Sequence, residues 1–134
     1  MINKFYFLIL GSLILIDQLS KLAVSKLGWS IFLNDQFAFS LPVPTVLMFA
    51  IYFLVLSGSF FYIYKFWKNF SDQQKLAWTL VVAGGLSNVV ERIFLGSVRD
   101  FIPLAGGMLN FADLYILIGL VLLLVSTRSQ DPTQ

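Results

Sequence analysis

Two aspartates near the edges of apolar sequence could act on the same chemical bond. Asp100 and Asp113 lie in the stretch GSVRDFIPLAGGMLNFADLYILIG, and the second opens a long apolar run. Two neighbouring carboxyl groups cannot both ionise cheaply, so one keeps its proton, the other is a base, and their titrations are coupled. The base can take a proton from water while the acid polarises a peptide carbonyl, as in aspartic proteases. The pair therefore predicts hydrolysis of a peptide bond.

The residue types that are missing narrow the chemistry further. The chain has no cysteine and no histidine, which excludes disulfides, zinc sites of the usual Cys/His type, cysteine nucleophiles and Ser-His triads. Acid–base work falls to Asp, Glu, Lys or Tyr, and we expect neither a cofactor nor a metal. A net charge of +2 is too small and too scattered to predict nucleic-acid binding.

The elements that must position the aspartates are apolar and long. The chain of 134 residues is 58% hydrophobic, more than a soluble domain of this size could bury. Spanning a bilayer takes about 20 apolar residues, and in lipid the backbone must satisfy its own hydrogen bonds. The sequence predicts an all-α membrane protein, one domain over 1–134, with four transmembrane helices at about 4–25, 46–65, 75–95 and 111–127. The first block lacks a small-x-small cleavage site, so we expect it to be retained as a helix.

Charge between the helices predicts their orientation. If the helices alternate in direction, one side of the membrane carries five cationic residues, which are Lys4, Lys65, Lys68, Lys75 and Arg128. The opposite side carries only Lys26 and Arg99. This bias predicts cytoplasmic termini and a cytoplasmic middle loop. The intramembrane polar residues then gather at the extracytoplasmic side.

Several of these polar residues also have a purely structural interpretation. Asp17 and Lys21 form an i,i+4 pair that is either a neutralised interfacial pair or part of a site. Gly84, Asn88, Arg92 and Gly96 recur at i+4 on the third helix, a pattern that close helix packing also explains. Taken alone, the latter pattern favours packing.

The loop residues leave similar alternatives. Asn110 is a candidate N-cap for the fourth helix, and Asp113 at its third position suits the helix dipole. Asn34 and Asp35 could form an Asx turn. SIFLNDQFAFS and VRDFI are predicted to form short strands at the membrane surface. Asp100 has no capping role to explain it, and this favours the catalytic interpretation of the pair.

These motifs resemble those of the lipoprotein signal peptidase (signal peptidase II) family. DQLSK, N…FAFS, GGLSNVVERIFLGSVRDFI and NFAD occur in the order and spacing of that family, from Asp17 to Ile116. The resemblance implies a bacterial inner-membrane aspartic endopeptidase, with a four-helix bundle and a small extracytoplasmic β-cradle. It also implies the substrate, which is a prolipoprotein that carries a diacylglyceryl-cysteine. The enzyme would cut this substrate within the membrane lipid, just before the modified cysteine. We expect a monomer.

The resemblance assigns roles residue by residue. Asp100 and Asp113 would be the catalytic pair. Six residues would bind substrate or support the site: Asp17, Lys21, Asn34, Asn88, Arg92 and Asn110. Asn34 and Arg92 would hold the substrate main chain, and Asn88 and Asn110 would orient the site. Asp17 and Lys21 would support the site structurally.

The sequence departs from the family pattern at two motifs. Asn34 is followed by Asp35, Gln36 and Phe37 where the family usually has x-Gly-Ala, and Glu91 stands where Asp is common. The outer loops are also short. Both catalytic candidates are present.

Two other classes of protein remain open from the sequence. A small four-helix multidrug exporter would use an acidic residue of its first helix, such as Asp17, to bind cations and protons. A structural membrane subunit would use the polar face of the third helix for assembly but would leave Asp100 without a role.

Overall fold

The computed structural model describes residues 3–36, 42–104 and 107–128, which are mostly helical. The helices are α1 (Lys4–Lys26), α2 (Thr45–Phe66), the 3-10 turn η2 (Trp67–Asn69), α3 (Asp72–Leu95) and α4 (Phe111–Arg128). The strands are β1 (Phe32–Asn34), β2 (Val98–Asp100), β3 (Ile102–Leu104) and β4 (Gly107–Leu109).

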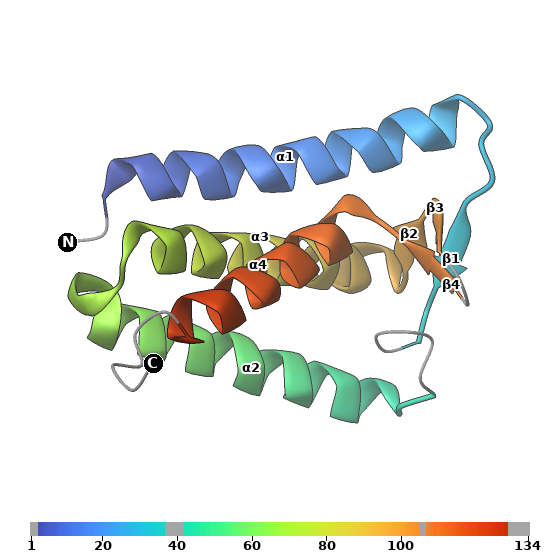
Figure 1. Cartoon of the computed structure of the whole chain (residues 1–134). Helices are drawn as coiled ribbons and strands as arrows, with labels where there is room; N and C mark the ends of the chain where they lie inside the picture. Colours follow the sequence, from blue (N-terminus) through green and yellow to red (C-terminus); the bar gives the residue numbers. More distant parts are fainter. Residues whose placement is uncertain (1–2, 37–41, 105–106, 129–134) are drawn as a thin grey trace.

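The helices form an elongated bundle in which α3 and α4 run between α1 and α2 (Figure 1). All the strands gather at one end of this bundle, which we call the strand end. The start of α1, η2 and the start of α3 lie at the opposite end, which carries Lys4, Lys65, Lys68 and Lys75 and which we call the lysine end. The long helices therefore place two chemically different ends far apart.

Helix α3 begins one turn earlier than its apolar block because its first turn is well capped. Ser71 accepts a hydrogen bond from the Gln74 N–H (3.2 Å), and the Gln74 side chain accepts one from the Ser71 N–H (3.0 Å). This capping box satisfies donors that the first turn would otherwise leave free. The helix ends at Gly96, whose φ of 75° is the left-handed conformation that favours glycine at a C-cap. Gly96 thus stops α3, leaving Gly84 as the packing glycine of the predicted face.

The strands form two small antiparallel pairs at the strand end. β1 pairs with β2, so that Phe32 faces Asp100 across the sheet, and β3 pairs with β4. The first pair lies within the two stretches predicted as strands, although the FAFS part of the first stretch lies outside the described residues. Apart from Ile102, the last residue of VRDFI, the second pair was not predicted, because Pro103 and Gly107 are poor strand formers. Among the described residues each strand pairs with only one neighbour, and such edge positions tolerate proline.

Glycines allow α3 and α4 to approach closely. A Cβ at Gly84 would lie 2.3 Å from the Ala112 carbonyl oxygen, and one at Gly119 would lie 2.7 Å from the Ala77 carbonyl oxygen. Both distances are far shorter than a normal carbon–oxygen contact, so only glycine fits at these two positions. Gly84 therefore packs α3 directly against the first turn of α4, which carries Asp113.

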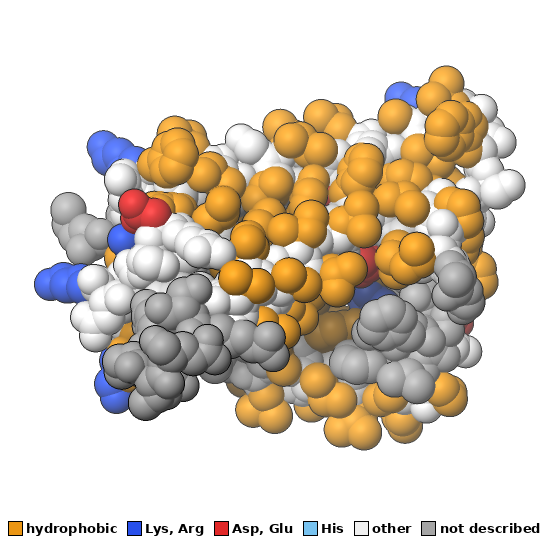
Figure 2. Space-filling model, viewed as in Figure 1, with side chains coloured by type: hydrophobic (Ala, Val, Ile, Leu, Met, Phe, Trp, Pro, Cys, Tyr) orange, Lys and Arg blue, Asp and Glu red, His pale blue; other side chains and the backbone are white. Residues whose placement is uncertain are grey.

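The outer surface of the bundle is apolar and suits lipid. Long side chains such as Leu8, Phe53, Leu54 and Phe94 are more than two-thirds exposed, and hydrophobic groups cover the middle of the face shown in Figure 2. Patches of this extent on a protein in water would mark an interaction surface. Three helices, α1, α2 with η2, and α3, are long and apolar enough to cross a membrane, and α4 contains a shorter apolar segment. The chain is a membrane-embedded protein.

Candidate active site

Asp100 and Asp113 line one cavity of about 210 Å³ near the strand end. Asp100 closes β2 and is 2% exposed, and Asp113 lies in the first turn of α4. The cavity also contains four of the six supporting residues that the sequence singled out, namely Asn34, Asn88, Arg92 and Asn110. Its remaining wall is largely apolar, with Val98, Met108, Leu109, Ile116, Leu117 and Leu120. At about 30 Å³ per liquid water molecule, this volume admits a few waters or a short piece of peptide.

Asn110 connects the two aspartates. Its side-chain amide donates a hydrogen bond to Asp100 Oδ1 (2.6 Å), and its backbone N–H donates to Asp113 Oδ2 (3.1 Å). In return, the Asp113 N–H donates to Asn110 Oδ1 (3.0 Å). This last bond makes Asn110 the N-cap of α4, as its sequence position predicted, and fixes which way its amide points. One residue therefore sets the placement of both carboxyl groups.

Two further asparagines donate to the remaining carboxylate oxygens. Asn34 Nδ2 donates to Asp100 Oδ2 (3.1 Å), and Asn88 Nδ2 donates to Asp113 Oδ1 (2.8 Å). Amide donors to all four oxygens stabilise the ionised forms of the pair.

The pKa of Asp100 lies above its usual range. Burial is the largest cause, because it penalises the charged form. The hydrogen bonds from Asn110 and Asn34 oppose this rise, the nearby negative charge of Asp113 adds to it, and the positive charge of Lys21 opposes it. The carboxyl group is therefore poised to hold a proton more readily than an exposed aspartate.

Beneath the cavity, a buried network of four charged residues joins three elements. Lys21, on α1, is fully buried. Its Nζ lies 2.8 Å from Asp17 Oδ2 and 2.9 Å from Glu91 Oε2. Glu91, on α3, also pairs through its Oε1 with the Arg99 guanidinium and accepts from the Arg99 N–H (3.3 Å). The two acids and two bases balance each other, and this is how buried charges become tolerable.

The network reaches each aspartate through a different route. Lys21 Nζ donates to Asn88 Oδ1 (3.1 Å). Since an ammonium can only donate, this contact turns the Asn88 NH₂ toward Asp113. Arg99 directly precedes Asp100 in β2. Because Glu91 binds both the backbone N–H and the side chain of Arg99, it fixes the position of this strand. Asp17 contributes by accepting from the Ala112 N–H (3.0 Å), which anchors the start of α4.

Arg92, on α3, lines the cavity and is buried. Its terminal nitrogen donates to the Gln36 carbonyl (2.8 Å), and its guanidinium carbon lies 5.5 Å from the centre of the Tyr52 ring. The Nε of Arg92 is buried and has no hydrogen-bond partner among the described residues. A strong donor at the cavity wall is thus left unused.

Three residues of this site were not foreseen as members. Ser87 donates to Asp17 Oδ2 (2.7 Å), Arg99 pairs with Glu91, and Tyr52 lies against Arg92. Glu91, where the sequence departs from the family pattern, pairs with Lys21. No sequence signal marks Ser87 or Tyr52, since each looks like ordinary helix composition. Among the described residues, no group of three or more Asp, Glu, His or Cys side chains is placed to hold a metal ion.

Comparison with known families decides where this arrangement belongs. The sequence pattern of the family described as signal peptidase (SPase) II matches residues 9–128, which include every charged residue of the cavity and of the network beneath it. The chain belongs to the signal peptidase II family. The resemblance carried by the short motifs is thereby confirmed.

Relatives of this signal peptidase II family member are found in several bacteria. It is 32% identical to the lipoprotein signal peptidase of Fusobacterium nucleatum, over 93% of this chain and 85% of the relative. It is 32% identical to that of Borreliella burgdorferi, over 92% and 88%. The match to the Streptococcus pneumoniae protein, at 34% identity, covers 73% of this chain and 66% of the relative.

Solved structures share the fold of this family member. Two structures described as a bacterial membrane enzyme superpose with TM-scores of 0.78 and 0.79, covering 99% and 97% of this chain. The superpositions cover 95% and 96% of the two solved chains, and the sequence identities are 18% and 19%. The shared fold comprises the helix bundle and its strand end.

Proposed function

We propose that this chain is an aspartic endopeptidase that removes the signal peptide of diacylglyceryl-modified prolipoproteins, cutting just before the lipidated cysteine. The single observation that carries the proposal is the link through Asn110. Two carboxyl groups from separate elements line one cavity and hydrogen-bond to the same asparagine. Membership of a signal peptidase family and the names of the relatives support the choice of substrate.

The proposed reaction needs only one shared proton and one water molecule. The ionised carboxylate takes a proton from water, and the water oxygen attacks the scissile carbonyl carbon while the protonated carboxyl group gives its proton to the carbonyl oxygen. The tetrahedral intermediate then collapses: its carbon–nitrogen bond breaks, the departing nitrogen receives a proton from one carboxyl group, and a hydroxyl proton returns to the other. The cycle ends with one proton on the pair, as it began.

Arg92 and the apolar wall would position the substrate. The unused Nε of Arg92 suits a main-chain carbonyl of the peptide, which is a neutral acceptor. Leu117 and Leu120 line the cavity and are also about half exposed on the outside of α4. The cavity is therefore bordered by lipid-facing surface, from which a substrate that is itself anchored in the bilayer could enter.

The proposal includes a topology. All four helices would cross the inner membrane, with α4 as the shortest span, and the strand end would face outward as a small cradle for the substrate. The distribution of lysines supports this orientation, because Lys4, Lys65, Lys68 and Lys75 gather at the other end. The protein would act as a monomer, without cofactor or nucleic acid.

The bonding of Asp17 argues against the exporter alternative. A cation-binding acid needs a free oxygen, whereas Asp17 is fully buried and uses both oxygens on Lys21, Ser87 and the Ala112 N–H. The structural-subunit alternative does not explain why Asp100 is buried in a cavity where three asparagines donate hydrogen bonds to the pair.

The test is cleavage by the purified chain in lipid nanodiscs. We expect a diacylglyceryl-modified precursor to be cut before its modified cysteine and the unmodified precursor to remain intact. Asp113→Asn should abolish this cleavage by removing one partner of the pair, whereas Asp35→Asn should retain it, because Asp35 is an exposed aspartate that does not line the cavity. Full cleavage by the Asp113→Asn variant would contradict the proposal.

A further inference from the structure

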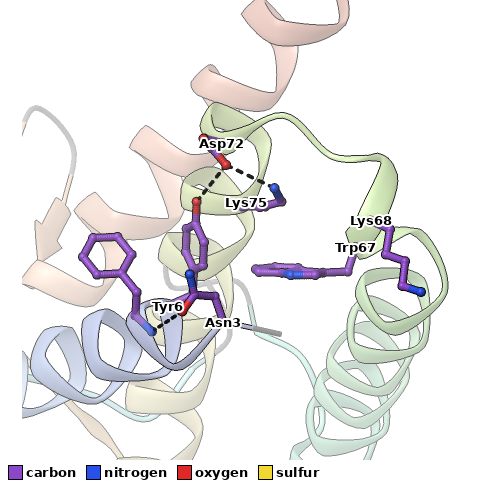
Figure 3. Close-up of a pocket in the computed structure, with 7 residues that line it drawn as sticks. Asn3, Tyr6, Trp67, Lys68, Asp72 and Lys75 are labelled. Carbon is purple, nitrogen blue, oxygen red and sulfur yellow. Dashed lines mark hydrogen bonds and ion pairs between the residues drawn. The ribbon is translucent and has the colours of Figure 1, made fainter. Parts of the chain in front are cut away.

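A second pocket lies at the lysine end, far from the aspartates. It has a volume of about 440 Å³ and is lined by Asn3, Phe5, Tyr6, Trp67, Lys68, Asp72 and Lys75 (Figure 3). This volume falls in the range of small-molecule sites, which is about 300–1,000 Å³. The pocket joins the start of α1 to η2 and to the first turn of α3, so it depends on the tertiary fold.

The polar rim of this pocket carries mixed charge. Figure 3 shows the Tyr6 hydroxyl and the Lys75 ammonium converging on Asp72, while Lys68 extends on the far side of the Trp67 ring. Both contacts to Asp72 use its Oδ1, at 3.3 Å and 3.1 Å. Lys68 has no ion pair with any residue that the structure describes. A ligand that brings negative charge would therefore find a free cation at the rim.

The inner wall of the pocket continues into an apolar groove. Tyr6 and Trp67 line both, with their rings packed edge to face at 5.1 Å. Beyond them the groove is lined by Phe7, Leu10, Phe60, Ile63, Trp78, Thr79 and Val82. A polar compartment and an apolar groove that share two aromatic residues match the two halves of an amphiphile.

Charge complementarity selects the kind of amphiphile. Of the described acidic residues only Asp72 lies at this end, against Lys4, Lys65, Lys68 and Lys75. This surplus of positive charge favours an anionic headgroup. Basic pockets between membrane helices commonly bind anionic phospholipid headgroups.

We propose that the pocket binds one anionic phospholipid, with its headgroup phosphate at Lys68 and Lys75 and part of an acyl chain in the groove. Lys75 would share its ammonium between the phosphate and Asp72. The site is independent of the cleavage reaction, since no residue of it lies near the aspartate pair. A bilayer lipid held here would fasten α1 to α2 and α3 at the end where the described residues form no buried ion network.

Tryptophan quenching tests this proposal directly. Trp67 and Trp78 line the groove, and the third tryptophan, Trp29, is an exposed residue in the connection that leads to β1. In a Trp29→Phe background the fluorescence therefore reports the groove. Nanodiscs of unlabelled phosphatidylcholine would contain a small fraction of acyl-brominated lipid, either phosphatidylglycerol or phosphatidylcholine, because bromine quenches tryptophan on contact.

We expect the brominated phosphatidylglycerol to quench well beyond its mole fraction and the brominated phosphatidylcholine to quench only in proportion to it. Replacing Lys68 and Lys75 by glutamine should lower the affinity for phosphatidylglycerol about 25-fold, at about fivefold for each lysine. The matched control replaces Lys4 and Lys65 by glutamine, removing the same charge from the same end but outside the pocket, and should preserve most of the affinity.

Two results would overturn the site. Equal quenching by the two brominated lipids would show that only bulk lipid touches the groove. Equal losses of affinity in the pocket and control variants would show that general surface charge attracts the lipid. Glycerol 3-phosphate distinguishes the headgroup alone from the whole lipid: if this water-soluble compound competes with an affinity equal to that of the lipid, the groove adds nothing to binding and its role is refuted.

Discussion

The two ends of the bundle use lysine in opposite ways. At the strand end, Lys21 is fully buried and contacts Asp17, Glu91 and Asn88. At the lysine end, Lys68 is exposed and has no ion pair in the described part of the chain. The strand end is held by a balanced polar network, whereas the lysine end is held by packing around Ile63, Trp67 and Val82.

This difference separates a site that must be rigid from a surface that need not be. A buried charge is stable only in one arrangement of its partners, so the network fixes the positions of Asn88 and of the start of α4. Aromatic and aliphatic packing tolerates small shifts, and exposed lysines adapt to whatever anion is near. Catalysis needs the first property, because a small misplacement of reacting groups is costly.

The sharpest way to break the comparison is to remove the same side chain at both ends. Lys21→Met leaves Asp17 and Glu91 buried without their shared cation, so the free energy of unfolding should fall by about 3–5 kcal/mol. Cleavage should also be lost. Without the Lys21 ammonium, the side-chain amide of Asn88 can rotate by half a turn and lose its hydrogen bond to Asp113. Thermal unfolding in a neutral detergent measures the first effect.

Lys68→Met is the matched control. It should leave the unfolding temperature in neutral detergent unchanged, because this lysine supports no other residue of the described chain. Equal unfolding temperatures for the two methionine variants would refute the contrast between the ends.

A smaller effect is expected from filling the contact between α3 and α4. In Gly84→Ala the new methyl group would meet the Ala112 carbonyl oxygen, which is backbone and cannot turn away. Over-packing of this kind costs about 1–3 kcal/mol. The shift of α4 would carry Asp113 with it. The activation free energy of cleavage should therefore rise by more than the free energy of unfolding falls.

Gly58→Ala is the control for this substitution, because no atom lies within 4 Å of a Cβ at that position. It should retain the cleavage rate of the wild type. A Gly84→Ala enzyme with wild-type kcat would show that the close approach of the helices does not position the aspartate.

The smallest predicted effect is a displacement of the pH profile. Asn34→Ala removes a hydrogen bond that stabilises the ionised form of Asp100, so the pKa of that carboxyl group should rise further above its usual range. The limb of the kcat/KM profile that this group governs should move to higher pH, whether the group serves as acid or as base. Asp35→Asn, one residue away, should leave both limbs in place; an unmoved profile in Asn34→Ala would show that the bond has no influence on titration.

Local signals in the sequence predicted much of the site. Asn110 followed three residues later by Asp113 is a capping pattern, and the structure has both of its hydrogen bonds. Lys21 and Asp17, spaced i,i+4, form the ion pair that their spacing allows. Such features depend on neighbours within one helical turn, so the sequence contains them directly.

Contacts between distant segments could not be read in this way. Arg99 was counted only as a loop cation, yet it pairs with Glu91 because Gly96 turns the chain back after α3. No sequence signal marked Ser87, but it donates to an acid seventy positions away. The β3–β4 pair was missed because its edge position, which tolerates Pro103, exists only once the strands have folded.

The central claim is that Asp100 and Asp113 work as one unit on one proton. Single-turnover cleavage of the lipid-modified precursor by Asp100→Asn, Asp113→Asn and the double variant tests it most directly. We predict that each single change slows cleavage by about 10³-fold or more and that the double change slows it no further, as for residues that act together. A single variant that cleaves at the wild-type rate, or a double variant whose loss is the product of the two single losses, would contradict the account.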